Sequence, residues 1–195
     1  MRRRPDVQPA VATRDRILNA AVLRFSRHSY EATGLRDIAA DVGVDVAYVH
    51  RCFGSKERLF AEAVGAAMEP ALLLNGPADE LAGALAKQIF AHDAARGRDE
   101  VGPLDIVIRS LSSPEASRVL TEFIVKDFIQ PLAGKLDQPA AARAAVIAAF
   151  LAGLGILRNV LRISPLQEAE GGDVEHLIAS AIGQMINAGV GVRPA

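Results

Sequence analysis

The side chains of this chain that are best suited to a chemical task lie between Thr33 and Lys56. Tyr48, His50 and Arg51 follow one another closely in a short helical pattern, and Lys56 comes soon after it. Hydroxyl, imidazole, guanidinium and ammonium groups all form hydrogen bonds with phosphate oxygens and with base edges in the DNA major groove. These side chains are of the kinds that a nucleic-acid-binding surface uses.

Catalytic patterns are weak in the same sequence. The four histidines are far apart, none has a Cys or carboxylate partner at metal-ligand spacing, and no GxSxG, P-loop or Gly-rich dinucleotide turn is found. We therefore predict no catalytic residue, no metal and no cofactor, and we do not expect an enzyme. The alternative that stays open is a helical enzyme or a small-molecule-binding protein without a role on DNA.

Short amphipathic helices are expected to hold the polar side chains. Gly43 lies between the two shortest of them, where a turn needs the positive φ that Gly adopts at little cost. Asp45 follows as the N-cap of the next helix, and its carboxylate is expected to face that helix rather than a DNA phosphate. From the apolar period, the first of these helices begins at about Thr13. The next three are expected over Leu35 to Asp41, Val46 to Cys52 and Lys56 to about Leu74.

Three motifs fall in register with this layout: Thr33-Gly34-Leu35-Arg36-Asp37-Ile38-Ala39, Gly43-Val44, and Phe53-Gly54-Ser55-Lys56-Glu57. Together they resemble the DNA-binding domain of tetracycline-repressor (TetR) family regulators, over about the first third of the chain. The resemblance implies a helix-turn-helix whose second helix enters the major groove, with Lys56 and the neighbouring helix N-terminus on a phosphate. The expected DNA contacts are Thr33, Arg36, Asp45, Val46, Ala47, Tyr48, His50, Arg51 and Lys56.

Three positions depart from the pattern of the family that the chain resembles. Asp45 stands where most relatives have Ser or Thr, His50 where Tyr is usual, and Cys52 where His or Tyr is usual. His50 can still form a hydrogen bond with a phosphate or a base edge, and the alternative is a solvated surface histidine. Ser55 and Glu57 are also the residues of an ordinary helix N-terminus, which is compatible with the same function.

Composition agrees with an all-α chain of two domains. Half of the 195 residues are hydrophobic and only 5% are aromatic, which favours helix over sheet. Residues 1–62 carry eleven Lys and Arg against eight Asp and Glu, whereas residues 63–195 carry eleven against fifteen, so the basic excess lies in the first part. We expect a basic arm over residues 1–12, which is either a solvated tail or a contact to DNA. A three-helix helix-turn-helix domain is expected over 13–62, and a helical ligand-binding and dimerisation domain over 63–195.

Two long apolar helices are expected in the second domain, over Ala140 to Arg162 and from Asp173 to about Gly189. Glycines within the first suggest close approach by another helix. By family resemblance, both helices pair with their copies across a two-fold axis, which implies a homodimer. The expected dimer interface is Leu151, Gly155, Ile178, Ile182 and Met185. The 14-residue apolar run from Ala144 to Leu157 is read as a buried core helix rather than a membrane span.

The remaining helices of that domain are expected to enclose a small, largely apolar effector. A buried Arg109 or Arg158 would favour an anionic or carbonyl-bearing ligand, because an apolar helix rarely hides an unpaired guanidinium. One cysteine and no secretory signal predict a cytoplasmic protein without a membrane partner. Its expected partners are double-stranded operator DNA, the effector and a second copy. The expected pocket lining is Ile89, Phe90, Ile106, Val107, Arg109, Ser110, Phe123, Ile124, Phe128, Phe150, Leu154 and Arg158.

Overall fold

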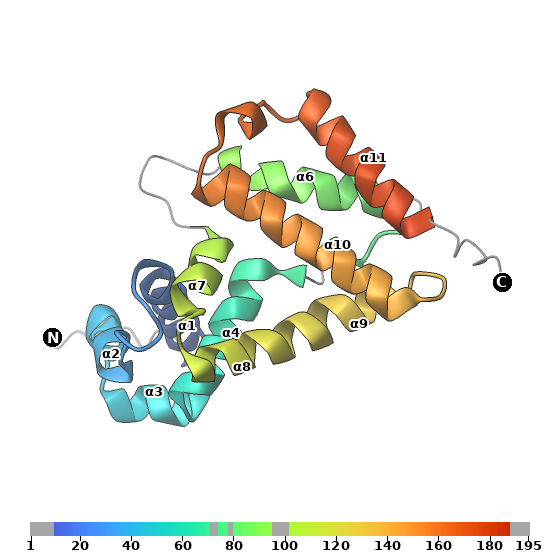
Figure 1. Ribbon diagram of the computed structural model, residues 1–195. Helices are drawn as coiled ribbons and strands as arrows, with labels where there is room; N and C mark the ends of the chain where they lie inside the picture. Colours follow the sequence, from blue (N-terminus) through green and yellow to red (C-terminus); the bar gives the residue numbers. More distant parts are fainter. Residues whose placement is uncertain (1–9, 71–73, 78–79, 95–101, 188–195) are drawn as a thin grey trace, which may run out of the picture. The chain divides into compact units, whose positions relative to one another are not determined.

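The computed structural model describes residues 10–70, 74–77, 80–94 and 102–187, and all regular secondary structure in them is helical (Figure 1). No strand occurs in these ranges, as the composition predicted. The described residues form two compact units. The first unit takes the chain up to Ala67 together with Asp105–Leu120, and the second takes Met68–Leu104 and the chain from Thr121 onward.

The first unit contains α1 (Ala10–Arg27), α2 (Leu35–Val42), α3 (Val46–Phe53) and most of α4 (Lys56–Met68). It also contains most of α7 (Pro103–Ser110) and α8 (Pro114–Phe123). The sequence placed a single boundary between residues 62 and 63, whereas the chain leaves this unit within α4 and returns to it for Asp105–Leu120.

The turn between α2 and α3 forms as the sequence predicted. Gly43 has φ 73° and ψ 38°, a left-handed conformation that strains residues with a side chain. Its amide and the Val44 amide donate to the last carbonyls of α2, at Ala40 (3.2 Å) and Ala39 (3.0 Å). Asp45 then caps α3, because its Oδ1 accepts a 2.7 Å hydrogen bond from the Ala47 amide. The turn thus fixes the direction in which α3 leaves α2.

Aromatic and aliphatic side chains fill the core of the first unit. The Phe60 ring of α4 contacts the Phe25 and Tyr30 rings edge to face, at centroid distances of 4.9 and 5.0 Å. Ile17, Phe25, Ile38, Val49 and Phe60 are all fully buried. Each of the helices α1 to α4 therefore turns one apolar side toward this core, as the i, i+3/i+4 spacing predicted.

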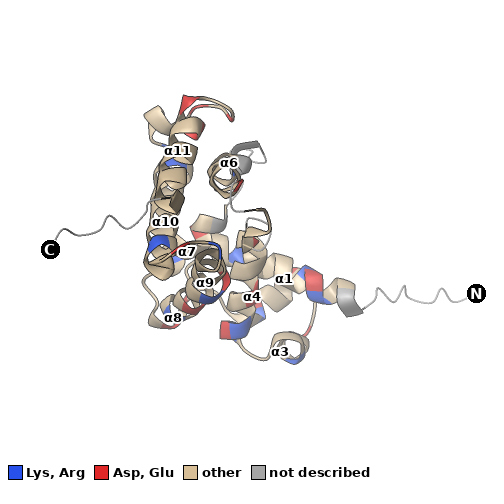
Figure 2. Ribbon diagram, turned by 90° about the vertical axis from the view of Figure 1, so that its right-hand side faces the viewer, with Lys and Arg blue, Asp and Glu red and all other residues tan. Residues whose placement is uncertain are grey.

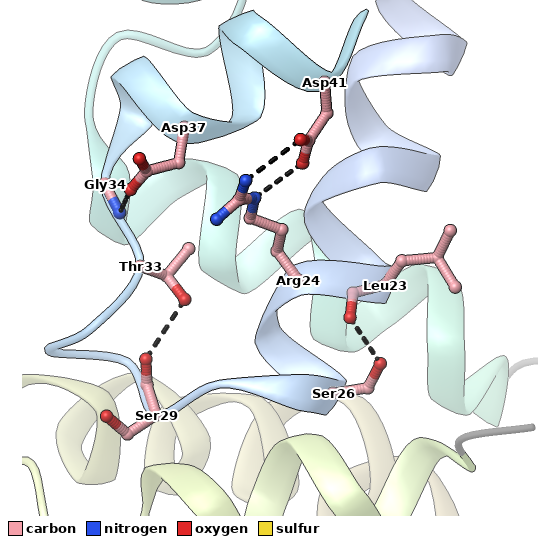
Figure 3. A network of polar contacts seen from close by, with 8 residues as sticks. All are labelled: Leu23, Arg24, Ser26, Ser29, Thr33, Gly34, Asp37 and Asp41. Atoms are coloured by element: carbon pink, nitrogen blue, oxygen red, sulfur yellow. Dashed lines mark hydrogen bonds and ion pairs between the residues drawn. The ribbon is translucent and has the colours of Figure 1, made fainter. Parts of the chain in front are cut away.

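A polar network fastens the N-terminal half of this unit (Figure 3). The Arg24 guanidinium of α1 forms a two-pronged ion pair with Asp41 of α2, with a 2.9 Å bond from Nη2 to Oδ1. The Gly34 amide donates to Asp37 Oδ2 at 2.9 Å and so caps the start of α2. These bonds hold α2 in place against α1.

Helices α7 and α8 are bonded to the first unit by side chains that are distant in sequence. Arg109 Nε donates to the Ser26 carbonyl at 2.9 Å, and Ser113 Oγ donates to Glu31 at 2.6 Å. Arg118 Nη2 donates to Glu57 at 2.6 Å. Asp105–Leu120 therefore belongs structurally with the helix-turn-helix, although it follows α6 in the sequence.

The second unit is built from α6 (Leu81–Ala94), α9 (Gln130–Ala133), α10 (Ala140–Gly155) and α11 (Asp173–Asn187). Helix α11 lies along α6 and also contacts α10. The most buried members of its core come from all four helices and from the segment before α6. They are Leu74, Leu81, Leu85, Ala86, Ile89, Phe90, Leu132, Ala144, Ile147, Ile178 and Ile182.

Two π-helical turns interrupt the long helices. The first, η1 (Ile124–Ile129), joins α8 to α9 and ends two residues before Pro131. A proline removes one amide donor and crowds the preceding turn, so a wider turn before Pro131 is a way to keep the helix running. The second, η2 (Ile156–Val160), extends α10, and the short 3-10 helix η3 (Ser164–Leu166) follows.

Helix ends differ from the expected ones at a few places. Helix α1 begins at Ala10, three residues before the expected start at Thr13. Helix α4 ends at Met68 rather than near Leu74, and Glu69 follows with φ 42°. The helical segment Ala140–Val160 is 21 residues long with mean hydropathy 2.0. By length and composition it could cross a membrane, a test that core helices of soluble proteins also pass.

Candidate nucleic-acid interface

Helix α3 divides its side chains between the core and the surface. Val49 and Phe53 are buried, at 0% and 4% exposure. Ala47, His50 and Arg51 are exposed, and Val46 and Tyr48 are half-buried. The expected outward face of the recognition helix is therefore present on the protein surface.

Tyr48 and Arg51 form a pair on that face. The Arg51 guanidinium carbon lies 5.3 Å from the centroid of the Tyr48 ring, one helical turn away. A cation over an aromatic face is attracted by the electrons of the ring. The Tyr48 ring therefore restricts where the guanidinium of Arg51 can reach, before any ligand is bound.

His50 is tied to the C-terminal end of its own helix. Its Nδ1 lies 3.1 Å from the carbonyl oxygen of Gly54, whose own amide donates to the His50 carbonyl at 2.8 Å. Gly54 has φ 79° and ψ −56°, a backbone conformation that side chains disfavour. The imidazole ring is thus fixed by a backbone turn that requires Gly.

The start of α4 carries Lys56 close to the core. The Lys56 ammonium lies 4.1 Å from the centroid of the Tyr30 ring, and burial is the main cause that lowers the pKa of Lys56. The charges of Glu31 and Glu115 act in the opposite direction. Ser55 Oγ accepts the Arg58 amide at 3.2 Å, so Ser55 has the helix-capping role that the sequence left open. Lys56 as a residue is only half-buried, and a phosphate contact by it stays a prediction.

Thr33 requires a correction among the expected DNA contacts. Its side chain is 1% exposed, and its Oγ1 donates to the Ser29 carbonyl at 3.1 Å (Figure 3). The hydroxyl therefore closes the loop before α2 and does not face solvent. Arg36, the second residue of α2, is exposed as a DNA contact would require. Asp45 is exposed too, and its carboxylate caps α3 as expected.

The structure brings together only part of the expected ligand pocket. Five of its residues lie in or against the core of the second unit: Ile89, Phe90, Phe128, Phe150 and Leu154. Phe123 is half-buried and Ile124 is exposed. The other expected lining residues of α7, namely Ile106, Val107, Arg109 and Ser110, belong to the first unit, so they are not part of this core.

The two arginines of the expected pocket differ in their surroundings. Arg109 is exposed and bonded to the Ser26 carbonyl, so it is not a buried charge. Arg158 is 2% exposed, and its guanidinium carbon lies 4.0 Å from the centroid of the Phe90 ring. Its Nη2 also donates to the Glu168 carbonyl at 2.8 Å. Of the two arginines that the sequence analysis named, only Arg158 is therefore buried.

The expected dimer interface needs correction at three positions. Ile178 and Ile182 are 4% and 0% exposed because they face the core of their own unit. Gly155 is also buried, and a Cβ built there would clash with a methyl carbon of Leu104. Leu151 and Met185 are half-buried. The apolar period of α11 showed two apolar faces but not which of them is the inner one.

Other apolar residues of the second unit are exposed instead. Leu177 of α11 is 70% exposed and Val146 of α10 is 57% exposed. Leu157 in η2 and Leu161 just after it are 42% and 59% exposed. Most of α10 and α11 carries neither Lys or Arg nor Asp or Glu, and both helices are largely tan in Figure 2. The dimer interface expected from the sequence did not include any of these four exposed residues.

The comparisons with known proteins agree with this architecture. Residues 17–63 match the family model "Bacterial regulatory proteins, tetR family", and residues 79–186 match "Tetracyclin repressor-like, C-terminal domain". No curated protein matches the chain significantly.

Among the residues that the structure describes, no cluster of His, Cys, Asp and Glu is suited to hold a metal ion.

Solved structures with the same fold cover almost the whole chain. A TetR-family regulator from Streptomyces coelicolor is 26% identical, with TM-score 0.57 over 95% of this chain and 99% of that one. NalD, the secondary repressor of the MexAB-OprM multidrug efflux pump in Pseudomonas aeruginosa, is 20% identical, with TM-score 0.64 over 91% and 98%. A protein of Saccharomonospora viridis, solved in complex with choline, is 21% identical, with TM-score 0.54 over 90% and 96%. With both of its domains matched by family models, this chain belongs to the TetR family of transcriptional regulators.

Proposed function

We propose that this regulator is a repressor that binds a palindromic operator as a homodimer and leaves it when a small, largely apolar effector binds. The observation that carries the proposal is the surface of α3, where the Tyr48–Arg51 pair and the fixed His50 ring stand side by side along the helix after a capped turn. Such a helix offers donors and acceptors to base edges in the major groove.

The unpartnered apolar surface of the second unit supports the homodimer. Only 17% of the most apolar window of Ala140–Val160 is buried within one chain. Leu177, Val146 and Leu161 add large exposed side chains. An apolar surface of this kind is stabilised when a second copy covers it. Two recognition helices held in this way would meet two half-sites about one DNA turn apart, roughly 34–36 Å.

Repression and effector release are inferred by analogy with relatives of the same fold. NalD is a repressor by name, and the Saccharomonospora viridis protein binds choline. The apolar core formed by α6, α9, α10 and α11 is where we place the effector, with Phe90 and Phe150 among the residues closest to it. The protein is expected to act in the cytoplasm, where DNA is found.

Footprinting tests this function directly. Purified protein is incubated with the DNA upstream of its own gene and with genomic fragments, at low salt. We expect one protected palindrome, and we expect its affinity to fall steeply with added salt because phosphate contacts release counterions. No protected palindrome in either DNA at low salt would contradict the function. A cofactor that co-purifies at one per chain would favour the alternative, an enzyme.

A further inference from the structure

His50 is the one side chain of the α3 surface whose hydrogen-bonding role is set by the protein before DNA arrives. Its Nδ1 lies 3.1 Å from the Gly54 carbonyl oxygen. A carbonyl oxygen can only accept a hydrogen bond, so the proton of this bond must be on Nδ1. In the neutral ring, Nε2 then carries no proton and can only accept.

The partner of this bond is itself fixed in place. The Gly54 amide donates to the His50 carbonyl at 2.8 Å, so the two residues exchange hydrogen bonds, one through the backbone and one through the side chain. Gly54 holds a φ of 79°, which other residues rarely adopt. The Arg58 side chain of α4 lies against Gly54 and would stand 3.3 Å from a Cβ there. Rotation of the ring would break the exchange, so Nε2 stays on the side away from Gly54.

An acceptor on this surface can pair with only some groups of DNA. Phosphate oxygens only accept hydrogen bonds, and so do O6 and N7 of guanine. The major-groove donors are the exocyclic amino groups, N6 of adenine and N4 of cytosine. The neighbouring Arg51 has donors only, so it cannot pair with those amino groups.

We propose that His50 is a specificity-determining residue: its Nε2 accepts a hydrogen bond from the amino group of an adenine or a cytosine in the operator. This rests on the proposed function, because it needs α3 in the major groove. In this proposal His50 accepts a hydrogen bond from a base amino group, whereas Arg51 donates hydrogen bonds to acceptor atoms of the DNA.

The first experiment measures the proton position without DNA. The full chain is labelled with ¹⁵N, and two-bond imidazole correlations are recorded at a pH above the usual titration range of histidine. The His50→Gln variant identifies the His50 signals by their loss. We expect the Nδ1–H form, and His176 serves as an internal reference because its Nδ1 lies 2.9 Å from the Gly172 carbonyl. An Nε2–H form or a charged ring at that pH would overturn the proposal.

The second experiment measures base preference. A randomised duplex library is selected at the same pH with the wild-type protein, with His50→Ala and with His50→Lys, which has only donors. The wild type should select adenine or cytosine at one pair of symmetry-related positions. His50→Ala should lose that preference about 2- to 10-fold, the contribution of one neutral hydrogen bond, and keep the rest of the consensus. His50→Lys should select guanine there.

Matched controls separate this inference from the proposed function. His28→Ala removes an exposed histidine from the loop between α1 and α2, in the same unit, and should leave the consensus unchanged. Circular dichroism and thermal unfolding check that each variant is folded. If His50→Ala lowers affinity for every sequence equally with an unchanged consensus, His50 is a phosphate contact and the inference is wrong. If the wild type selects no consensus, the proposed function itself fails.

Discussion

The carboxylate of Asp41 in α2 accepts two hydrogen bonds from the guanidinium of Arg24 in α1. The two residues are 17 positions apart in sequence, and their pair joins α1 to α2 at the surface, with side-chain exposures of 28% for Arg24 and 39% for Asp41. A fixed, two-pronged geometry of this kind is more specific than most surface ion pairs.

Asp41→Asn should lower the free energy of unfolding near neutral pH by about 0.2–1 kcal/mol, the usual range for exposed pairs. The bond from Arg24 lowers the pKa of Asp41 in the folded protein. The stabilisation is therefore present above the unfolded pKa of about 3.9 and is lost as the pH falls through the lower folded value. Urea unfolding across this range measures it. In a double-mutant cycle with Arg24→Gln, additive effects would show that the pair contributes nothing.

Leu177→Glu should convert the dimer to a folded monomer that no longer binds the operator tightly. Leu177 is 70% exposed in one chain, so the substitution places a charge in the proposed interface without disturbing the core. Light scattering and thermal unfolding measure the two properties. Ile182→Glu is the matched control, because Ile182 is 0% exposed and its replacement should unfold the second unit. A dimeric Leu177→Glu protein would show that the interface lies elsewhere.

Tyr48→Ala should weaken operator binding even where the Tyr48 hydroxyl makes no contact, because the ring restrains Arg51 at 5.3 Å. Tyr48→Phe keeps the ring and should bind almost as the wild type does. Arg51→Ala should cost about 1–3 kcal/mol of binding free energy if it pairs with a guanine, with relaxed preference at that base. Affinity measurements on one operator and its single-base variants distinguish these outcomes. Equal losses for Tyr48→Phe and Tyr48→Ala would assign the effect to the hydroxyl.

Ser113→Ala should lower the free energy of unfolding by about 1 kcal/mol, as the loss of a helix N-cap does. Ser113 Oγ is the acceptor for the Ala116 amide at the start of α8, and it also donates to Glu31 at 2.6 Å. Thermal unfolding measures the change. Ser112→Ala, at the exposed residue just before Ser113, provides the comparison. Equal effects of the two substitutions would argue against a special role of Ser113.

An effector should raise the thermal stability of the protein and lower its operator affinity together. Coupling between two sites is typically about 1–3 kcal/mol, or 5- to 150-fold in affinity. A thermal-shift screen of small apolar metabolites and drugs, followed by operator competition, is the measurement. A compound that stabilises the protein and leaves operator affinity unchanged would argue against the coupling.

Local patterns predicted the helix-turn-helix part of the fold well. The bounds of α2 and α3, the left-handed Gly43 and the Asp45 cap all follow from residues within one or two turns of each other. Such features depend on the backbone preferences of single residues and on short-range hydrogen bonds. They can therefore be predicted from the local sequence alone.

Features that depend on distant partners were not predictable in the same way. Thr33 reads as a polar residue at a helix start, and only the folded loop shows that its hydroxyl bonds to Ser29. Ile178 and Leu177 are adjacent apolar residues of α11, and only the position of α6 decides which is buried. The contacts from Arg109 and Ser113 back to the first unit span more than 80 residues. No local pattern indicates such pairings.

The two π-helical turns have a consequence for how this chain is aligned with its relatives. A π-helical turn contains about one residue more than an α-helical turn, so it works as a one-residue insertion that the helix absorbs without a loop. Each residue of an α-helix advances the side chains by about 100°. Deleting one residue from an ordinary α-helical turn of α10 would therefore rotate everything after it, whereas deleting one from Ile156–Val160 would convert η2 into an α-helical turn and leave Leu161 in place. In a relative that lacks the turn, the residue that superposes on Leu161 is therefore one position away from the residue that an ungapped sequence alignment pairs with Leu161.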